Sequence, residues 1–320
     1  RVHRRRPVLR RLFGCLLLAS WLPLAGGCAS APAAATPARA GAEETVAAAS
    51  RRCGCRMGVA ARHLESGRSF EHNASEVFES ASVIKIAILT EAMAGVRDGR
   101  IDLSARWTMA PEALADGSGV LLLLDPGLAP TWNDLLTLMI GPSDNTATNA
   151  WIERLGTDQI NARMAAVGLP RIQLLGRIPS LSSRGAQPSP WSSLRLGEVT
   201  PKEVADWMER VARGEMLDRE SSGRIFAYLD KDPSRLRIAR RFPSAALWAG
   251  KTGSMRGVRN DAGVLRTNKG RFVLVILTDG STAESTSPAD HPSVLAIADV
   301  AASIVRDWSG GLPDLPESPR

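Results

Sequence analysis

The sequence predicts an α+β fold with an α/β/α layered arrangement, in which both ends of the chain build one antiparallel sheet. Three observations predict it: two strand-like runs near the start, about three near the end, and mainly helical patterns between them. The strand-like runs cover residues 56–64, 69–72, 245–249, 262–267 and 271–278. The helical middle, about residues 100–214, would form a separate lobe. The seam between lobe and sheet is then the expected place for a pocket.

Turn signals and apolar spacing justify the individual elements. The turn Glu65-Ser66-Gly67-Arg68 separates the first two strand runs, and Asn268-Lys269-Gly270 separates the last two, so each pair reads as a hairpin. Helical patterns cover residues 83–96, 133–139, 147–155, 201–213 and 292–308.

The first 27 residues have the pattern of a secretory signal peptide. Six arginines and no acid precede an apolar run at residues 12–24, which is too short for a confident membrane span. Cys28 follows the small residues Ala25-Gly26-Gly27, so we expect an exported lipoprotein, periplasmic or in the cell envelope, anchored to the membrane at Cys28. Cleavage after Ala31 competes, but Pro32 disfavours it. Residues 28–49 would be an Ala/Pro-rich, lipid-anchored linker, and residues 50–320 the folded domain.

Charge and cysteine content exclude several partners. The net charge is +7, and setting aside the six arginines of residues 1–27 leaves +1, so no nucleic-acid surface is expected. Cys53 and Cys55 are two residues apart, where a disulfide is strained, and two cysteines fall short of a zinc set. We therefore expect two partly buried thiols, no metal and no cofactor.

The segment Ser82-Val83-Ile84-Lys85 has the pattern of an activated nucleophile. It heads a largely apolar helix, so Ser82 would lie in the first turn with Lys85 one turn later on the same face. A serine hydroxyl needs a base within hydrogen-bond reach, and a buried lysine can be neutral at pH 7 because desolvation disfavours its charge. Ser82 as a simple helix cap is the alternative.

Two further short motifs have the residue types of a substrate cleft. Ser143-Asp144-Asn145 lies between two helical stretches and offers a hydroxyl and an amide, although an ordinary turn has the same composition. Lys251-Thr252-Gly253 follows an apolar strand and could hold a carboxylate, with the glycine allowing backbone to approach a ligand. A lysine at a strand end on the surface is the alternative.

Together, the three motifs resemble the class A β-lactamases and penicillin-binding serine hydrolases, whose signature is S-x-x-K, S-D-N and K-T-G. The likeness extends over residues 56–308 and includes LLTLMIGPSDNTATN at 135–149 and KTGSMRGVRNDAG at 251–263. The resemblance implies that Ser82 is the acylated nucleophile and Lys85 its activating partner. Ser143 would return the proton to the leaving nitrogen, and Asn145 would hold the side-chain amide of the substrate.

The resemblance also implies where the rest of the substrate binds. Lys251 and Thr252, with Gly253 beside them, would bind its carboxylate, and the backbone N–H groups of Ser82 and Ser254 would form the oxyanion hole. The substrate would be a β-lactam or a peptidoglycan-like small molecule, and the protein a monomer.

The chain departs from class A enzymes at the residue that activates the deacylating water. Those enzymes carry a Glu-Pro pair in a loop after the S-D-N lobe, whereas this chain has Arg177-Ile178-Pro179 and no acid at all from residue 159 to 197. Glu198 could pair with Arg177 to clasp the loop, or it could reach inward as a substitute base. We favour the clasp.

Three functions remain open from the sequence. They are a β-lactamase, slow or with an unusual base; a penicillin-binding or sensor protein that stays acylated; and a cell-wall peptidase or esterase. The Tyr-x-Asn of related esterases is absent, because the only tyrosine, Tyr228, precedes Leu229-Asp230. No Gly-x-Ser-x-Gly occurs, and the four histidines are scattered, which excludes α/β-hydrolase and zinc chemistry.

Overall fold

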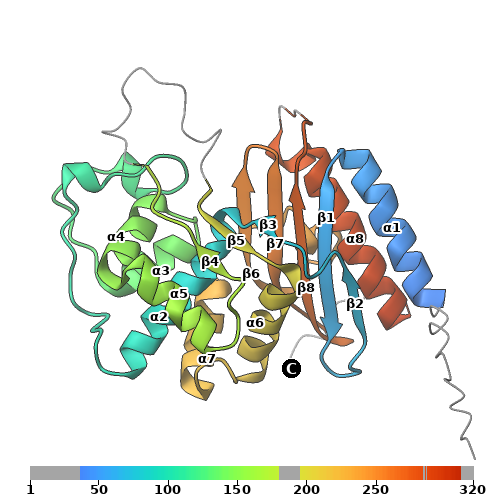
Figure 1. The fold of residues 1–320 in the computed structure, drawn as a ribbon, viewed down its shortest axis with the longest axis horizontal. Helices are drawn as coiled ribbons and strands as arrows, with labels where there is room; N and C mark the ends of the chain where they lie inside the picture. Colours follow the sequence, from blue (N-terminus) through green and yellow to red (C-terminus); the bar gives the residue numbers. More distant parts are fainter. Residues whose placement is uncertain (1–36, 180–194, 284, 286, 311–320) are drawn as a thin grey trace, which may run out of the picture. The chain divides into compact units, whose positions relative to one another are not determined.

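An antiparallel sheet of five strands lies at the centre of the computed structural model, which describes residues 37–179, 195–283, 285 and 287–310 (Figure 1). The strands are β1 (Arg56–His63), β2 (Ser69–His72), β6 (Leu247–Met255), β7 (Val258–Thr267) and β8 (Gly270–Asp279). They lie in the order β2-β1-β8-β7-β6, with every neighbouring pair antiparallel. The pairing of β1 with β8 joins the early and late strands, so the predicted fold class is confirmed.

Two helices, α1 (Pro37–Cys53) and α8 (Pro292–Ser309), cover one face of this sheet (Figure 1). They pack against each other, and their apolar side chains form one cluster with the inward-facing residues of β1 and β8. Val46 and Ile297 are fully buried there together with Val59 and Ile276. Burying each such side chain contributes roughly 1.5–3 kcal/mol, so this layer supports the sheet from behind.

Helix α1 starts before the predicted domain boundary at residue 50. Ala42, Val46 and Ala49 are spaced to lie on one helix face, and they are buried in the cluster shared with α8. Residues 37–49 therefore belong to the folded unit instead of a linker. The predicted signal peptide, Cys28 and the chain after residue 310 lie outside the described residues.

The expectation of free thiols at Cys53 and Cys55 is wrong, because the two residues form a disulfide. α1 ends at Cys53, and Gly54 adopts a φ of +55°, which turns the chain toward β1. This turn brings the two Cα atoms to 5.2 Å, within the usual range for a disulfide. The sequence separation alone did not reveal this geometry.

The helical lobe lies on the side of the sheet opposite α1 and α8 and is centred on a largely buried helix, α2 (Lys85–Arg97) (Figure 1). Its other helices are α3 (Trp132–Ile140), α4 (Asn145–Leu155), α5 (Thr157–Ala166) and α7 (Arg219–Leu229). Every residue of α2 from Lys85 to Gly95 is buried, and α2 contacts α4, α5 and α7. The lobe thus extends beyond the predicted limits, because α7 lies after residue 214 and was not predicted.

Helix α6 (Pro201–Arg213) falls within the predicted lobe but packs against the sheet. The Thr200 side chain caps its start by accepting from Glu203 N, and Pro201 occupies the first turn, where no N–H is needed. Its apolar face, which includes Val204 and Trp207, is buried in the cluster that also contains Val273 and Val275 of β8. α6 therefore provides the second covering layer of the sheet.

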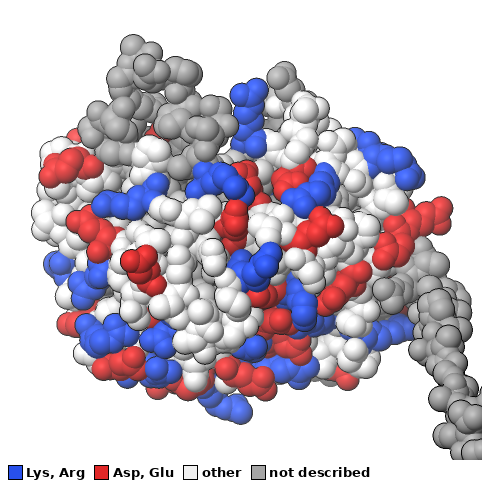
Figure 2. All heavy atoms as spheres, viewed as in Figure 1, with Lys and Arg blue, Asp and Glu red and all other residues white. Residues whose placement is uncertain are grey.

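A small second sheet connects the lobe to the main sheet. It has the order β3-β5-β4, with β3 (Phe78–Glu79), β5 (Gly197–Val199) and β4 (Gln173–Leu174). On the face shown in Figure 2, cationic and anionic side chains alternate without a broad surface of one sign. Among the described residues, no helix combines the length and apolar character needed to cross a bilayer.

Candidate active site

The predicted nucleophile lies at the junction of the lobe and the sheet. A 3₁₀ turn, η1 (Ala81–Ile84), carries Ser82 and leads directly into α2, which starts at Lys85. Ala81 has a φ of +44°, an unfavourable conformation for a residue with a Cβ. Ser82 is half-buried and lines a cavity of about 530 Å³, whereas Lys85 is fully buried beneath it. The predicted one-turn spacing is therefore present, on a 3₁₀ turn instead of an α-helical one.

Lys85 brings the first two motifs together. Its Nζ lies within hydrogen-bond distance of Ser143 O at 2.8 Å, Ser143 Oγ at 3.1 Å and Asn145 Oδ1 at 3.0 Å. Burial, and then the charge of Lys251, lowers the pKa of Lys85 well below its usual value, while Asp144 opposes this shift. Lys85 can therefore be a neutral amine, as a base must be. Among the described residues, its hydrogen bonds reach Ser143 and Asn145, and none reaches Ser82.

The loop that carries Ser143 is held in place by its neighbour Asp144. The Asp144 carboxylate accepts from Val120 N at 2.7 Å, Leu121 N at 2.8 Å and Ala147 N at 2.8 Å, so it caps α4 and anchors residues 118–121. Ser143 itself has a φ of +59°. Such strain persists where the surroundings fix the backbone, and it is common at functional sites. Asp144 therefore positions Ser143 and does not itself line the cavity.

The third motif lies within strand β6, at the edge of the sheet, and not after the strand as predicted. Thr252 and Ser254 line the same cavity as Ser82. Lys251 is fully buried behind them, with its Nζ 3.8 Å from a carboxylate oxygen of Asp232. The Thr252 hydroxyl donates to the same Asp232 oxygen at 3.3 Å. The described structure therefore places the motif on the cavity wall, with Lys251 balanced by one acid.

The requirement for a glycine at residue 253 is steric. A Cβ on this residue would lie 2.8 Å from Ser80 O and 3.2 Å from Ser82 N. No side chain fits between β6 and the turn that carries Ser82. Gly253 thus lets the two backbones approach, whereas the sequence interpretation had it approaching the ligand.

Arg237 is a site residue that the sequence analysis missed. Its guanidinium is largely buried, donates to Gly253 O at 2.8 Å and contacts Asn260 O and the Ser254 hydroxyl. A positive charge is therefore fixed behind the cavity wall at Ser254. Arg237 lies in a short irregular segment of an arginine-rich chain, so no spacing or motif distinguishes it in the sequence.

Asp261 lies on β7 close to the Arg237 guanidinium. Its buried carboxyl predicts that the stability of the folded protein depends on pH. Its burial raises the pKa of the carboxyl to about 7, against the opposing charge of Arg237. The unfolded carboxyl loses its proton near pH 3.9, so folding binds a proton between these values. We therefore expect the wild type to lose stability relative to Asp261→Asn as the pH rises from about 4 to about 7, by up to ~4 kcal/mol.

Urea unfolding of wild type and Asp261→Asn across this pH range measures the difference directly. Because other titrating groups are shared, they cancel in the comparison. A difference in unfolding free energy that stays constant with pH would contradict the assignment.

One part of the cavity lining is apolar. Ile178 and Leu196 line the cavity together with Ala81 and Met255, and no carboxylate is among the described residues of the lining. Ile178 is only 3% exposed. The Asn149 side chain holds the backbone of Ile178 on both sides, donating to Ile178 O at 2.8 Å and accepting from Ile178 N at 3.0 Å.

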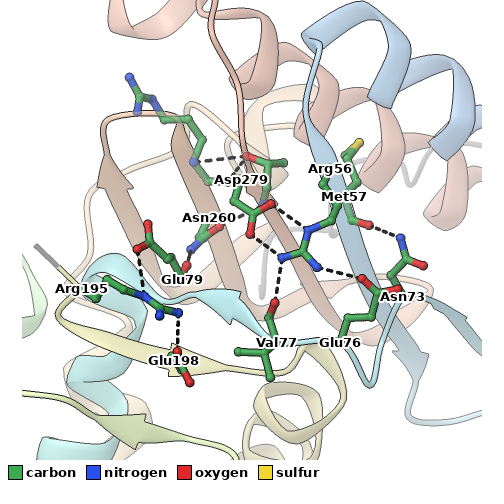
Figure 3. A network of polar contacts seen from close by, with 12 residues as sticks. Arg56, Met57, Asn73, Glu76, Val77, Glu79, Arg195, Glu198, Asn260 and Asp279 are labelled. Atoms are coloured by element: carbon green, nitrogen blue, oxygen red, sulfur yellow. Dashed lines mark hydrogen bonds and ion pairs between the residues drawn. The ribbon is translucent and has the colours of Figure 1, made fainter. Parts of the chain in front are cut away.

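The predicted clasp between Glu198 and Arg177 does not form. Arg177 pairs with Glu153 at 3.1 Å, and Glu198 pairs instead with Arg195, which also lies 3.4 Å from Glu79 (Figure 3). Glu198 sits on β5 opposite Glu79 of β3, which places two acids side by side for one arginine to bridge. It does not belong to the cavity lining, so the geometry does not favour it as a substitute base.

This site combines a serine on a short turn, a buried lysine with a depressed pKa, and a second serine hydroxyl within hydrogen-bond distance of that lysine. Together with the sheet and helical lobe, it defines a serine hydrolase of the Ser-x-x-Lys type. The described residues contain no group of three or more His, Cys, Asp or Glu side chains that could hold a metal ion.

The chain belongs to the Beta-lactamase enzyme family, whose model matches residues 41–308, and it is a serine β-lactamase-like hydrolase. It is 29% identical over 260 residues to a β-lactamase of Streptomyces cellulosae, covering 78% of this chain and 80% of that protein. Among solved structures, it is similar to a β-lactamase from Sphaerobacter thermophilus, with 32% identity and a TM-score of 0.74, covering 86% of this chain and 99% of the other.

The structure is also similar to that of PBP-A, with 25% identity and a TM-score of 0.73, covering 85% of this chain and 96% of PBP-A. A leucine-to-glutamate variant of PBP-A has been solved as an acyl-enzyme complex with penicillin G.

Proposed function

We propose that the protein is acylated at Ser82 by β-lactams and hydrolyses their amide bond, with release of the acyl group as the slow step. The observation that carries this proposal is the cluster around Lys85. One buried amine with a depressed pKa contacts both Ser143 and Asn145 below the cavity that Ser82 lines.

These contacts support the following sequence of steps for acylation. Ser82 Oγ attacks the lactam carbonyl carbon, and its proton passes to the neutral Lys85 amine. The negative oxygen that forms is stabilised by the N–H groups of Ser82 and Ser254. The C–N bond then breaks, and the proton moves from Lys85 through the Ser143 hydroxyl, 3.1 Å away, to the leaving nitrogen. Asn145 holds the side-chain amide of the substrate.

Deacylation lacks an equivalent base. A general base must lie within about 3 Å of the attacking water, or one water removed from it. Ile178 and Leu196 line the cavity, and among the lining residues that the structure describes there is no carboxylate. General-base catalysis is typically worth about 10²–10⁴-fold, so the acyl-enzyme should be longer-lived by a comparable factor.

A second candidate is a penicillin-binding or sensor protein that stays acylated. The buried Ile178 and the likeness to PBP-A favour it. A cell-wall peptidase or esterase remains the third candidate, for which the same nucleophile would accept a peptide or ester carbonyl.

Intact-mass spectrometry of the purified protein mixed with a penicillin over time tests the proposal. We expect an adduct of one penicillin per chain that forms quickly and decays slowly. An adduct that never decays would identify the penicillin-binding protein. No adduct at any time would contradict acylation by β-lactams and point to another acyl substrate.

Lys251 and Thr252 are proposed to hold the substrate carboxylate. A charge-assisted hydrogen bond contributes roughly 1.5–3 kcal/mol, or about ten- to a hundredfold in rate. Lys251→Ala should therefore slow acylation by a free-acid penicillin more than acylation by its neutral ester. Any general damage from removing the cation beside Asp232 affects both substrates alike, so equal losses would contradict this role.

We also propose that the protein is an exported monomer held to the membrane by a lipid on Cys28. Support comes from the arginine-rich, apolar N-terminal segment and the small residues before Cys28. The intact mass of protein extracted from membranes would show whether Cys28 is the modified N-terminus.

A further inference from the structure

The side chain of Asn260 connects the centre of the sheet to the segment just before the nucleophile. Asn260 lies on β7 and is fully buried. Its Oδ1 accepts from Thr278 N of β8 at 2.9 Å, while its Nδ2 donates to Glu79 O at 2.8 Å and to Ser80 O at 3.1 Å. Figure 3 shows the Asn260 amide pointing to Glu79. The Asn260 amide thus joins β7 to two other segments, β8 and residues 79–80.

The two carbonyls that Asn260 binds belong to Glu79 and Ser80, which come directly before Ala81 and Ser82. Ser80 O also accepts from Val83 N at 3.1 Å, which closes the 3₁₀ turn around the nucleophile. Ala81, which lies between Ser80 and Ser82, has the unfavourable φ of +44°. A strained residue keeps its conformation only where the surroundings fix it, and the Asn260 amide supplies two of the bonds that do so.

The same residue is also tied to the other side of the oxyanion hole. Asn260 pairs with Gly253 across β6 and β7, and the next pair is Ser254 with Arg259. Arg237 contacts both Gly253 O and Asn260 O, which fixes this register. The backbone of Asn260 therefore holds the strand that supplies Ser254 N, while its side chain holds the turn that supplies Ser82 N.

We propose that Asn260 is a positioning residue for the oxyanion hole, which sets the Ser82 N–H relative to the Ser254 N–H. This inference rests on the proposed acylation at Ser82. Donors of an oxyanion hole act only when they are aimed at the charge that develops, and removing one costs about 10²–10³-fold in rate. Displacing one donor without removing it should cost less, about ten- to a hundredfold.

The experiment compares Asn260→Ala and Asn260→Ser with the wild type, using stopped-flow acylation by a chromogenic cephalosporin. Serine puts no charge into the core and is too short to join Thr278 N to the two carbonyls, so it is the milder variant if Asn260→Ala fails to fold. We expect the acylation rate constant to fall at least tenfold, with the dissociation constant of the initial complex changed less than threefold. Affinity for a boronic acid, which forms a tetrahedral adduct on Ser82, should fall in parallel.

Thr90→Val is the matched control for loss of a buried hydrogen-bonding group. Thr90 is fully buried on α2, donates to Ile86 O at 2.7 Å and accepts from Trp207 Nε1 at 2.9 Å. This variant should lose thermal stability and still acylate at the wild-type rate. Asn260 variants that acylate as fast as wild type, or that slow only as much as Thr90→Val, would overturn the inference and leave the proposed function intact. A wild type that forms no adduct would overturn both.

Discussion

Ser82→Ala is expected to abolish labelling of the protein by a fluorescent penicillin. Ser82 is the serine on the strained η1 turn, it lines the cavity, and Lys85 lies one turn away beneath it. Without the hydroxyl, no covalent bond to the carbonyl carbon can form, so the expected loss is complete. Gel fluorescence and intact mass both measure it. Undiminished labelling of a folded Ser82→Ala protein would show that another residue is acylated.

Lys85→Arg should fail almost as completely. A guanidinium remains protonated in proteins and cannot take the serine proton, whereas the buried amine of Lys85 has its pKa lowered by desolvation. Lys202→Arg is the matched control, because Lys202 is half-exposed on α6 and pairs with Asp206 at 3.6 Å. The control should be labelled like wild type.

Ile178→Glu is expected to shorten the life of the acyl-enzyme by about 10²–10⁴-fold, the usual worth of a general base. The Asn149 amide holds the backbone of residue 178 on both sides, so the new carboxyl would be directed into the cavity that Ser82 lines. Decay of the penicillin adduct, followed by mass, measures the effect. The change should appear in deacylation and leave the rate of adduct formation largely unaltered.

Ile178→Gln separates base catalysis from a change in packing. Glutamine has nearly the same shape as glutamate and the same polar burial, but it cannot accept the proton of water. Its adduct should remain long-lived. If both variants released the acyl group equally fast, water access and not a missing base would limit the wild type.

The sequence was informative wherever a local pattern determines structure. The two hairpins follow from turn residues between apolar runs, and the three motifs follow from residue types that few other chemistries combine. The elements it missed depend on tertiary contacts. In α7, the buried apolar residues are few (Ile225, Tyr228 and Leu229), so the helical spacing of apolar residues is hard to recognise in the sequence.

The other features that the sequence analysis missed or misassigned also depend on tertiary contacts. The disulfide depends on the turn at Gly54, and the partner of Glu198 depends on β3 and β5 lying side by side. Arg237 reaches the site only because its segment packs against strands β6 and β7. Pairings of this kind are set by the fold and leave no mark at a fixed spacing.

The pairing of β1 with β8 has a consequence for when the protein becomes active during its synthesis. Val59 sits opposite Ile276 in the sheet, so this contact forms only after the chain has been synthesised through β8. Closing so long a loop is entropically costly, and sheets dominated by such distant pairings fold slowly. β6, which carries Thr252 and Ser254, joins the sheet only through β7, so the nucleophile turn has no opposite wall until then. A nascent or C-terminally truncated chain would therefore carry Ser82 without a complete site, and reactivity toward acyl substrates would arise in the last stage of folding.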